Sequence, residues 1–170
     1  MVGPLDHYRY LTTARRRVLD AVRGLTSEQY AQEFPFGLRS VRRTLLHMAG
    51  AEWFLIGQLR GGAEGEYPFS AQRVADLTAL ESGWQAQEQR TIDHIQAERD
   101  WERRIEFTVP TPGRRTFRVR ASALQVFTQF SYHEVHHRSQ VMAMLRHHGA
   151  PVETVDFLVL ACEVLEDTRA

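Results

Sequence analysis

Residues 132–140 read YHEVHHRSQ, and this stretch decides how the rest of the sequence is interpreted. His133 and His137 are four residues apart, so on an α-helix they lie on one face, a single turn from each other. Histidines at this spacing commonly supply two nitrogen ligands to a divalent metal ion. His133 and His136, three residues apart, form an alternative pair.

The apolar pattern of the same helix favours His137 over His136. One stripe of the predicted helix contains Val126, Phe130, His133, His137, Val141 and Met144. His137 lies near its centre, whereas His136 lies roughly 100° away. Histidines that face an apolar interior need partners, because burying an unpaired polar group is costly. A metal ion would satisfy both rings, and ordinary hydrogen bonds to carbonyl or carboxylate groups are the alternative.

The rest of the chain repeats the helical period, with one interruption. Apolar spacing predicts helices over residues 5–24, 40–60, 70–100 and 122–148, and a short last helix over 155–165. Ser70 is the predicted N-cap of the third helix. Residues 103–119 instead alternate apolar and polar side chains around a turn at 110–113, which predicts a β-hairpin. The expected fold is all-α, a four-helix bundle with a small hairpin, in a single domain spanning residues 1–170.

Composition excludes several classes of protein. Among the 170 residues, 21 basic and 21 acidic side chains cancel, and every basic residue is Arg. A balanced charge argues against nucleic-acid binding, and clusters such as residues 15–17 are typical of solvated faces. Cys162 is the single cysteine, which excludes an intrachain disulfide; its apolar neighbours predict that it is buried. No stretch resembles a signal peptide or a membrane span, so we expect a cytoplasmic protein.

A site with two histidines needs a third ligand from another helix. His47 and His94 are both candidates, and His47 is only modestly favoured because its neighbours are more apolar. Glu52 falls on the apolar face of the same helix as His47, where a carboxylate needs a cation or a donor. It could orient an imidazole or form an internal ion pair with an arginine. Glu134 is expected at the surface.

Two motifs together resemble the DinB/YfiT-like superfamily. The first is the run LLHM at residues 45–48 with Glu52 and Trp53 after it, and the second is His-x-x-x-His-Arg-x-Gln at residues 133–140, before Gly149. The resemblance covers nearly the whole chain, including the hairpin before the last long helix. Members of the superfamily fold as four-helix bundles and bind a divalent metal ion through three histidines. Carried over to this sequence, the resemblance implies that the ligands are His47, His133 and His137. Nitrogen ligands accept zinc, nickel, iron or copper, and we expect zinc or nickel.

The resemblance also suggests a reaction. Some members are transferases or isomerases that depend on bacillithiol, mycothiol or a related low-molecular-weight thiol. The expected function is therefore a metal-dependent thiol S-transferase acting on small electrophiles. One alternative is a hydrolase that uses a metal-bound hydroxide, with Glu52 or Glu134 as the general base; another is a non-catalytic, stress-induced metal-binding protein. No catalytic residue is assigned.

A second apolar stripe on the last long helix lies away from the histidines. It contains Leu124, Val135 and Met142. Because an apolar stripe needs covering, either the terminal helix or a second subunit must pack on it. We therefore expect a homodimer.

Overall fold

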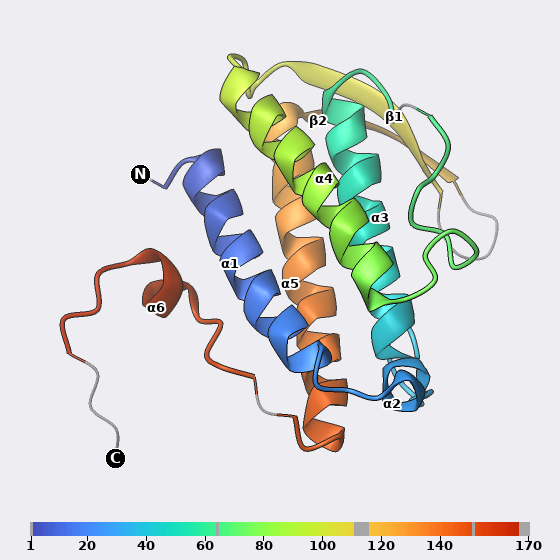
Figure 1. Cartoon of the computed structure of the whole chain (residues 1–170). Helices are drawn as coiled ribbons and strands as arrows, with labels where there is room; N and C mark the ends of the chain where they lie inside the picture. The colour runs from blue at the N-terminus through green and yellow to red at the C-terminus, as the bar shows by residue number, and fades with distance from the viewer. Residues whose placement is uncertain (1, 64, 111–115, 151, 167–170) are drawn as a thin grey trace. The chain divides into compact units, whose positions relative to one another are not determined.

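The structure, a computed structural model, describes residues 2–63, 65–110, 116–150 and 152–166, and it confirms the all-α fold class with one hairpin. The four predicted long helices are present as α1 (Pro4–Val22), α3 (Val41–Leu59), α4 (Leu77–Ala97) and α5 (Ala123–His147) (Figure 1). Two short helices, α2 (Ser27–Ala31) and α6 (Phe157–Ala161), and two antiparallel strands, β1 (Arg104–Pro110) and β2 (Thr116–Ser122), complete the described elements.

The chain divides into two compact units. The first unit contains the residues up to His47 and those from Glu134 onward, and the second unit contains residues 48–133. Both boundaries fall inside continuous helices, α3 and α5. The core of the first unit includes Tyr8, Leu11, Val18, Leu45, Val141 and Met144, and that of the second includes Ile56, Leu59, Leu80, Trp84, Val126 and Phe130. Each unit therefore has its own buried apolar side chains.

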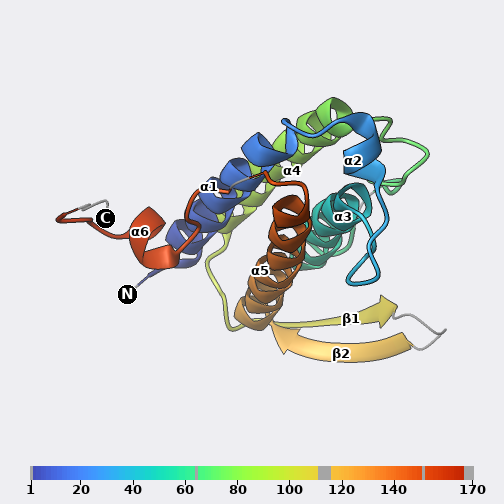
Figure 2. The same ribbon diagram turned by 90° about the horizontal axis from the view of Figure 1, so that it is seen from below.

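Local hydrogen bonds fix both ends of α5. The Ser122 hydroxyl accepts from the backbone N–H of Gln125 (3.1 Å), and the Gln125 carboxamide oxygen accepts from the N–H of Ser122 (2.8 Å). This reciprocal capping box begins the helix where β2 ends, as Figure 2 shows. At the other end Gly149 adopts a φ of 67°, and the N–H of Ala150 bonds to the carbonyl of Leu145 (3.1 Å). The helix ends there because only glycine takes this left-handed conformation without strain.

The predicted start of α4 is wrong. Ser70 does not cap this helix; its carbonyl instead accepts from the N–H groups of Arg73 and Val74 in a separate turn. The N-cap is Asp76, whose carboxylate accepts from the N–H of Ala79 at 2.8 Å. Asp is as good an N-cap as Ser, so the choice between them depended on tertiary context that the sequence pattern lacks.

The C-terminal prediction is also partly wrong. α6 covers only residues 157–161 of the predicted 155–165, and Cys162 is exposed rather than buried. The reason is that large apolar side chains of this segment are not buried: Leu158 on α6 is 72% exposed, and Leu165, beyond the end of α6, is 89% exposed.

The hairpin forms as predicted and extends three residues further, to Ser122. Phe107 is paired with Val119 in the antiparallel register, and its ring lies 6.2 Å from that of Phe54 on α3. Glu106 accepts from Arg118 and Arg120 at the surface, both at 2.6 Å. The turn predicted at residues 110–113 lies, apart from Pro110, outside the described residues.

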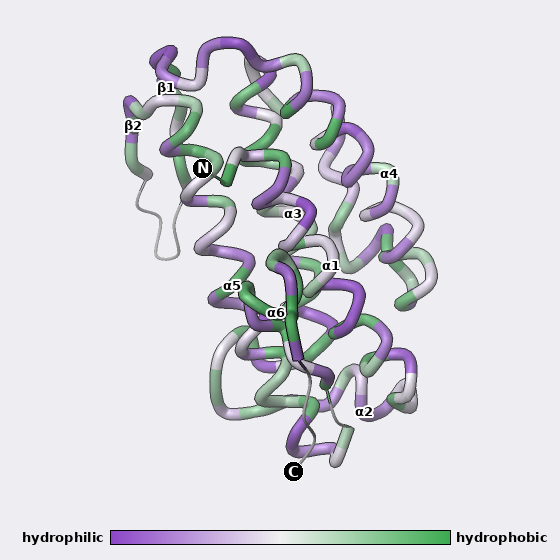
Figure 3. The backbone as a smooth tube through the Cα atoms, turned by 90° about the vertical axis from the view of Figure 1, so that its left-hand side faces the viewer, coloured by the Kyte–Doolittle hydropathy of each residue, from purple (hydrophilic) through white to green (hydrophobic). Residues whose placement is uncertain are grey.

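The long helices are amphipathic along their whole length. Figure 3 shows hydrophilic residues interspersed among the hydrophobic ones in each of them. Within the described part of the chain, no helix has the length and apolar character needed to cross a membrane.

The second apolar stripe of α5 is exposed to solvent, since Leu124 is 40% and Val135 42% exposed. The homodimer stays a prediction.

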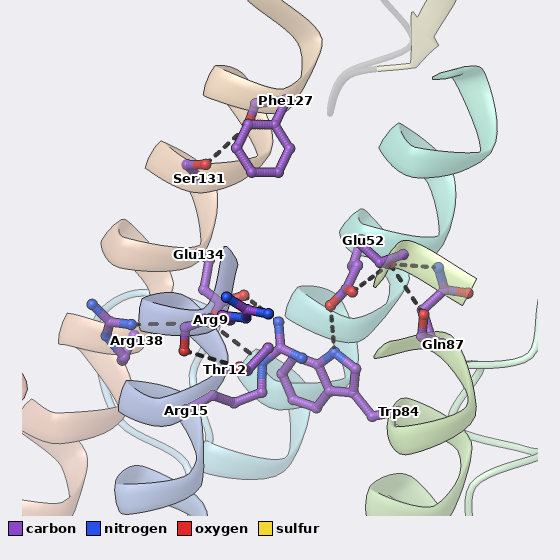
Figure 4. Close-up of polar contacts among 11 residues, drawn as sticks. Arg9, Thr12, Arg15, Glu52, Trp84, Gln87, Phe127, Ser131, Glu134 and Arg138 are labelled. Atoms are coloured by element: carbon purple, nitrogen blue, oxygen red, sulfur yellow. Dashed lines mark hydrogen bonds and ion pairs between the residues drawn. The ribbon is translucent and has the colours of Figure 1, made fainter. Parts of the chain in front are cut away.

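The first unit contains a buried ion pair that the sequence did not predict. Glu134 is 2% exposed rather than at the surface, and both of its carboxylate oxygens accept from Arg15 on α1, at 3.3 and 2.5 Å (Figure 4). Arg138, one turn further along α5, donates to the hydroxyl of Tyr10 at 2.8 Å, and that hydroxyl donates to the carbonyl of Val155 at 3.0 Å. These contacts fix how α5 is rotated within this unit.

The second unit contains a buried carboxylate that accepts hydrogen bonds from α4. Glu52 is fully buried, as its place on the apolar face predicts. One oxygen accepts from the indole N–H of Trp84 and the other from the hydroxyl of Thr91, both at 2.8 Å (Figure 4). Donors on α4 thus stabilise this group.

Removing one member of the Arg15–Glu134 pair should cost much more stability than removing both. We expect Glu134→Ala to lower the free energy of unfolding by about 3–5 kcal/mol, because it leaves a buried guanidinium without its partner. The double variant Arg15→Met, Glu134→Leu should recover most of that loss. Urea denaturation of the metal-free protein measures both changes.

A matched control is the exposed pair formed by Arg23 and Asp20 on the same unit. Asp20→Ala should change the free energy of unfolding by less than about 1 kcal/mol. If Glu134→Ala and Asp20→Ala lowered the free energy of unfolding equally, burial would not make the first ion pair more important for stability than the second.

Candidate metal centre

Three histidines come together as the sequence predicts. One ring nitrogen of each of His47, His133 and His137 lies within 4.8 Å of the others. His133 and His137 lie on successive turns of α5, and His47 lies on α3. His133 and His137 are half-buried, whereas His47 is exposed. This group could hold a metal ion and leave one side open to a small molecule.

The structure also separates the alternatives that the sequence left open. His136 is exposed, and its Nε2 lies 3.0 Å from the amide nitrogen of Gln140. His94 belongs to the second unit, where its Nε2 lies 3.7 Å from a carboxylate oxygen of Glu98. Neither belongs to a group of potential ligands within the described residues.

The environment favours the neutral form of two of the three imidazoles. The rings of His47 and His137 are 4.7 Å apart and nearly perpendicular. Burial, and then the proximity of His137, lowers the pKa of His47 below its ordinary value. Burial also lowers the pKa of His137, although its hydrogen bond to Gln140 acts in the opposite direction. A neutral imidazole has the free lone pair that metal binding requires.

Gln140 determines which nitrogen of His137 is available. Its carboxamide oxygen lies 2.9 Å from Nδ1 of His137, and its amide nitrogen lies near His136. A carboxamide oxygen only accepts, so Nδ1 must carry the proton and Nε2 keeps the lone pair. Partners of this kind fix the ring orientation of metal-binding histidines. Sequence analysis assigned no role to Gln140 beyond its place in the motif.

Gly37 makes room for this glutamine. A Cβ atom added at Gly37 would lie 2.9 Å from the Gln140 carboxamide oxygen, and its φ of 57° also favours glycine. The loop before α3 therefore packs directly on the residue that orients His137. This contact was not visible in the sequence, because more than a hundred positions separate the two residues.

The two carboxylates considered as general bases, Glu52 and Glu134, both accept hydrogen bonds from other side chains. Glu134 holds Arg15 in the first unit, and Glu52 accepts from Trp84 and Thr91 in the second. A general base must be free to take up a proton from its substrate. The structure therefore gives Glu52 and Glu134 structural roles. The sequence did contain an indication that Arg15 is buried, because it falls on the same stripe of α1 as Leu11, Val18 and Val22.

The sequence model of the DinB family matches residues 1–164. No curated protein matches the chain.

Replacing Gln140 should change the tautomer of His137. In the metal-free protein at neutral pH, we expect nitrogen NMR of the wild type to show His137 protonated at Nδ1. Gln140→Ala should shift His137 toward a mixture of both neutral tautomers, because the acceptor at Nδ1 is lost.

Ser139→Ala is the matched control. Ser139 is the exposed neighbour of Gln140, and its hydroxyl donates to the backbone carbonyl of His136 at 2.7 Å. Its loss should leave the His137 signals unchanged. Identical His137 signals in Gln140→Ala and the wild type would refute the assigned role.

Proposed function

The chain belongs to the DinB family, and on this premise we propose that it is a metal-dependent S-transferase that joins a low-molecular-weight thiol to a small electrophile. The observation that carries the proposal is the group formed by His47, His133 and His137, whose ligand atoms lie within 4.8 Å of one another. The three histidines fit a divalent ion, and nitrogen ligands suit zinc and nickel.

The charge of the ligand set favours a thiol. Three neutral imidazoles bring no negative charge, so the double charge of a divalent ion is left uncompensated. When bound, such an ion lowers the pKa of a coordinated thiol and keeps the sulfur as a nucleophilic thiolate. The chain's own contribution is to lower the pKa of His47 and His137, which favours their neutral form, and to orient His137 through Gln140.

The proposed reaction is a substitution at carbon. The thiol releases its proton to solvent, and the sulfur then attacks the electrophilic carbon with an electron pair. A carbon–sulfur bond forms while the bond to the leaving group breaks, and the leaving group departs with the bonding pair. No residue has to accept a proton from the substrate, which suits a site whose nearby carboxylate, Glu134, is already paired with Arg15.

Occupied carboxylates argue against the hydrolase alternative. Activating a water molecule for hydrolysis usually needs a general base within hydrogen-bond reach. Glu134 and Glu52 were the two candidates in the sequence, and both are held by donors. A transferase that uses a preformed thiolate has no such requirement.

The metal centre is tested first. Protein purified without an affinity tag should contain about one equivalent of zinc or nickel per chain by elemental analysis. His47→Ala, His133→Ala and His137→Ala should each lose most of this metal, because two nitrogen ligands hold a divalent ion poorly.

Two other histidines supply the controls. His94→Ala and His136→Ala should retain the metal, since neither residue belongs to the cluster. Loss of metal in His94→Ala but not in His47→Ala would reverse the assignment of the third ligand. A wild-type protein that takes up neither zinc nor nickel would refute the centre.

The transferase activity needs a separate assay. With 1-chloro-2,4-dinitrobenzene as the electrophile, the metal-loaded protein should accelerate thioether formation from bacillithiol, mycothiol or cysteine. The His137→Ala variant should show only the uncatalysed rate. If loaded wild-type protein accelerates the reaction with none of these thiols, the transferase proposal fails, and the non-catalytic metal-binding interpretation takes its place.

A further inference from the structure

The second unit contains a cavity unrelated to the histidine cluster. Its volume is about 390 Å³, within the range typical of small-molecule sites. The lining comes from the C-terminal part of α3, the turn that follows it, and α4. The side chains that give it chemical character are Trp53, Arg60, Gln87 and Arg90. None of these residues has a role in the proposed transferase.

Two arginines, Arg60 and Arg90, line this cavity. Within the described residues, neither Arg60 nor Arg90 takes part in an ion pair or a side-chain hydrogen bond. Arg103 of the same unit shows the contrast, because it donates to Glu98 at 2.7 Å and to the carbonyl of Leu59. Within the described part of the chain, these two guanidinium groups have no acidic partner, although the sequence contains as many acidic as basic side chains.

The charge of Arg60 acts on His94 of α4. His94 lies one turn after Arg90 on α4, and burial is the main cause of its lowered pKa. Arg103 and Arg60 lower the pKa of His94 further, whereas Glu98 raises it. Arg60 therefore lies close enough to His94 for its positive charge to act there, and a positive charge also attracts anions.

Apolar side chains line the same cavity. Trp53 and Ile56 line the cavity, and the Trp53 ring packs edge-on against Tyr67 with centroids 5.5 Å apart. Gln87 also lines it; this side chain is 5% exposed, and its amide donates to Thr91 at 3.3 Å. The combination of an aromatic surface and a few polar groups is typical of sites for small organic molecules.

Glycines build the remaining wall and preform the cavity. A Cβ atom at Gly57 would lie 2.8 Å from the Cα of Ala63, so the turn after α3 can approach the helix only because residue 57 is glycine. The N–H of Gly62 bonds to the carbonyl of Gly57 at 2.9 Å, and Gly62 has a φ of 140°. Because this turn is fixed by its own backbone, little ordering would be needed on binding.

We propose that this cavity binds a small organic anion, with a carboxylate or phosphate group held by Arg60 and Arg90 and a flat apolar part against Trp53. Guanidinium groups match both oxyanions, since their paired N–H donors can bond two oxygens at once. The inference goes beyond the proposed transferase, and its test requires no metal.

The test uses three probes that share one ring: benzoate, phenyl phosphate and the neutral benzyl alcohol. Titrations of the full chain are followed by the indole N–H signal of Trp53 in nitrogen–proton NMR spectra. We expect saturable binding of at least one anion with a Kd of about 1 mM or tighter, and no saturation with benzyl alcohol. A preference between the two anions identifies the group that the site recognises.

Variants then assign the binding to the two arginines. Arg60→Gln and Arg90→Gln should each weaken anion binding by about tenfold or more, which is the effect of losing one charge-assisted contact. Arg99→Gln is the matched control, because Arg99 is an exposed arginine of the same unit that does not line the cavity. It should bind as the wild type does, and circular dichroism checks that every variant is folded.

Three results would overturn the proposal. The first is the absence of saturable binding for both anions. The second is equal binding of benzyl alcohol, which would show an apolar cavity without anion recognition. The third is unchanged affinity in both folded variants, Arg60→Gln and Arg90→Gln, which would place the anion elsewhere.

Discussion

The buried pair of Arg15 and Glu134 is the contact on which the histidine site depends. Glu134 and Arg138 are four residues apart on α5, and so are His133 and His137, one position earlier in each case. Successive helical positions are about 100° apart, so anchoring the first pair fixes where the second pair points. Arg15 holds Glu134 and Tyr10 holds Arg138, both from α1. The histidines are thereby placed at the edge of the buried face, where they are half-exposed. An apolar residue at position 134 could fill the same space but could not select one rotation so strictly.

The motif His-x-x-x-His-Arg-x-Gln now has a physical explanation for each of its polar positions. The two histidines offer nitrogen atoms on one face, and Arg138 is 3% exposed and bonded to a tyrosine hydroxyl. Gln140 sets the tautomer of His137. The arginine and the glutamine thus act through the histidines, one by fixing the helix and the other by fixing the ring. The sequence resemblance named the ligands, whereas the structure explains why their neighbours are needed.

Much of the fold could be predicted from the sequence because local patterns determine it. Helical periodicity and glycine stop signals located the long helices, and strict alternation located the hairpin. Predictions failed where distant partners decide the outcome. Asp76 rather than Ser70 begins α4, and Glu134 is buried because Arg15 reaches it from a helix more than a hundred positions away. The three histidines were found because two of them share a helix; the cavity at Arg60 and Arg90 was missed because its residues carry no common spacing.

The exclusive use of arginine as the basic residue matters differently in the two units. In the first unit, Nε and an Nη atom of Arg15 bond separate oxygens of Glu134, a fork that the single ammonium group of lysine cannot form. Because this pair is buried, an imperfect fit between the two charged groups would cost folding free energy. The planar guanidinium group fits the carboxylate and so stabilises the fold. In the second unit, Arg60 and Arg90 present the same fork at a cavity wall without a partner in the described chain. A guanidinium group is hydrated more weakly than an ammonium group, so it gives up water to an oxyanion at lower cost. One residue type therefore serves as an internal clamp in one unit and as an open recognition surface in the other, and the difference lies in whether a carboxylate of the chain is within reach.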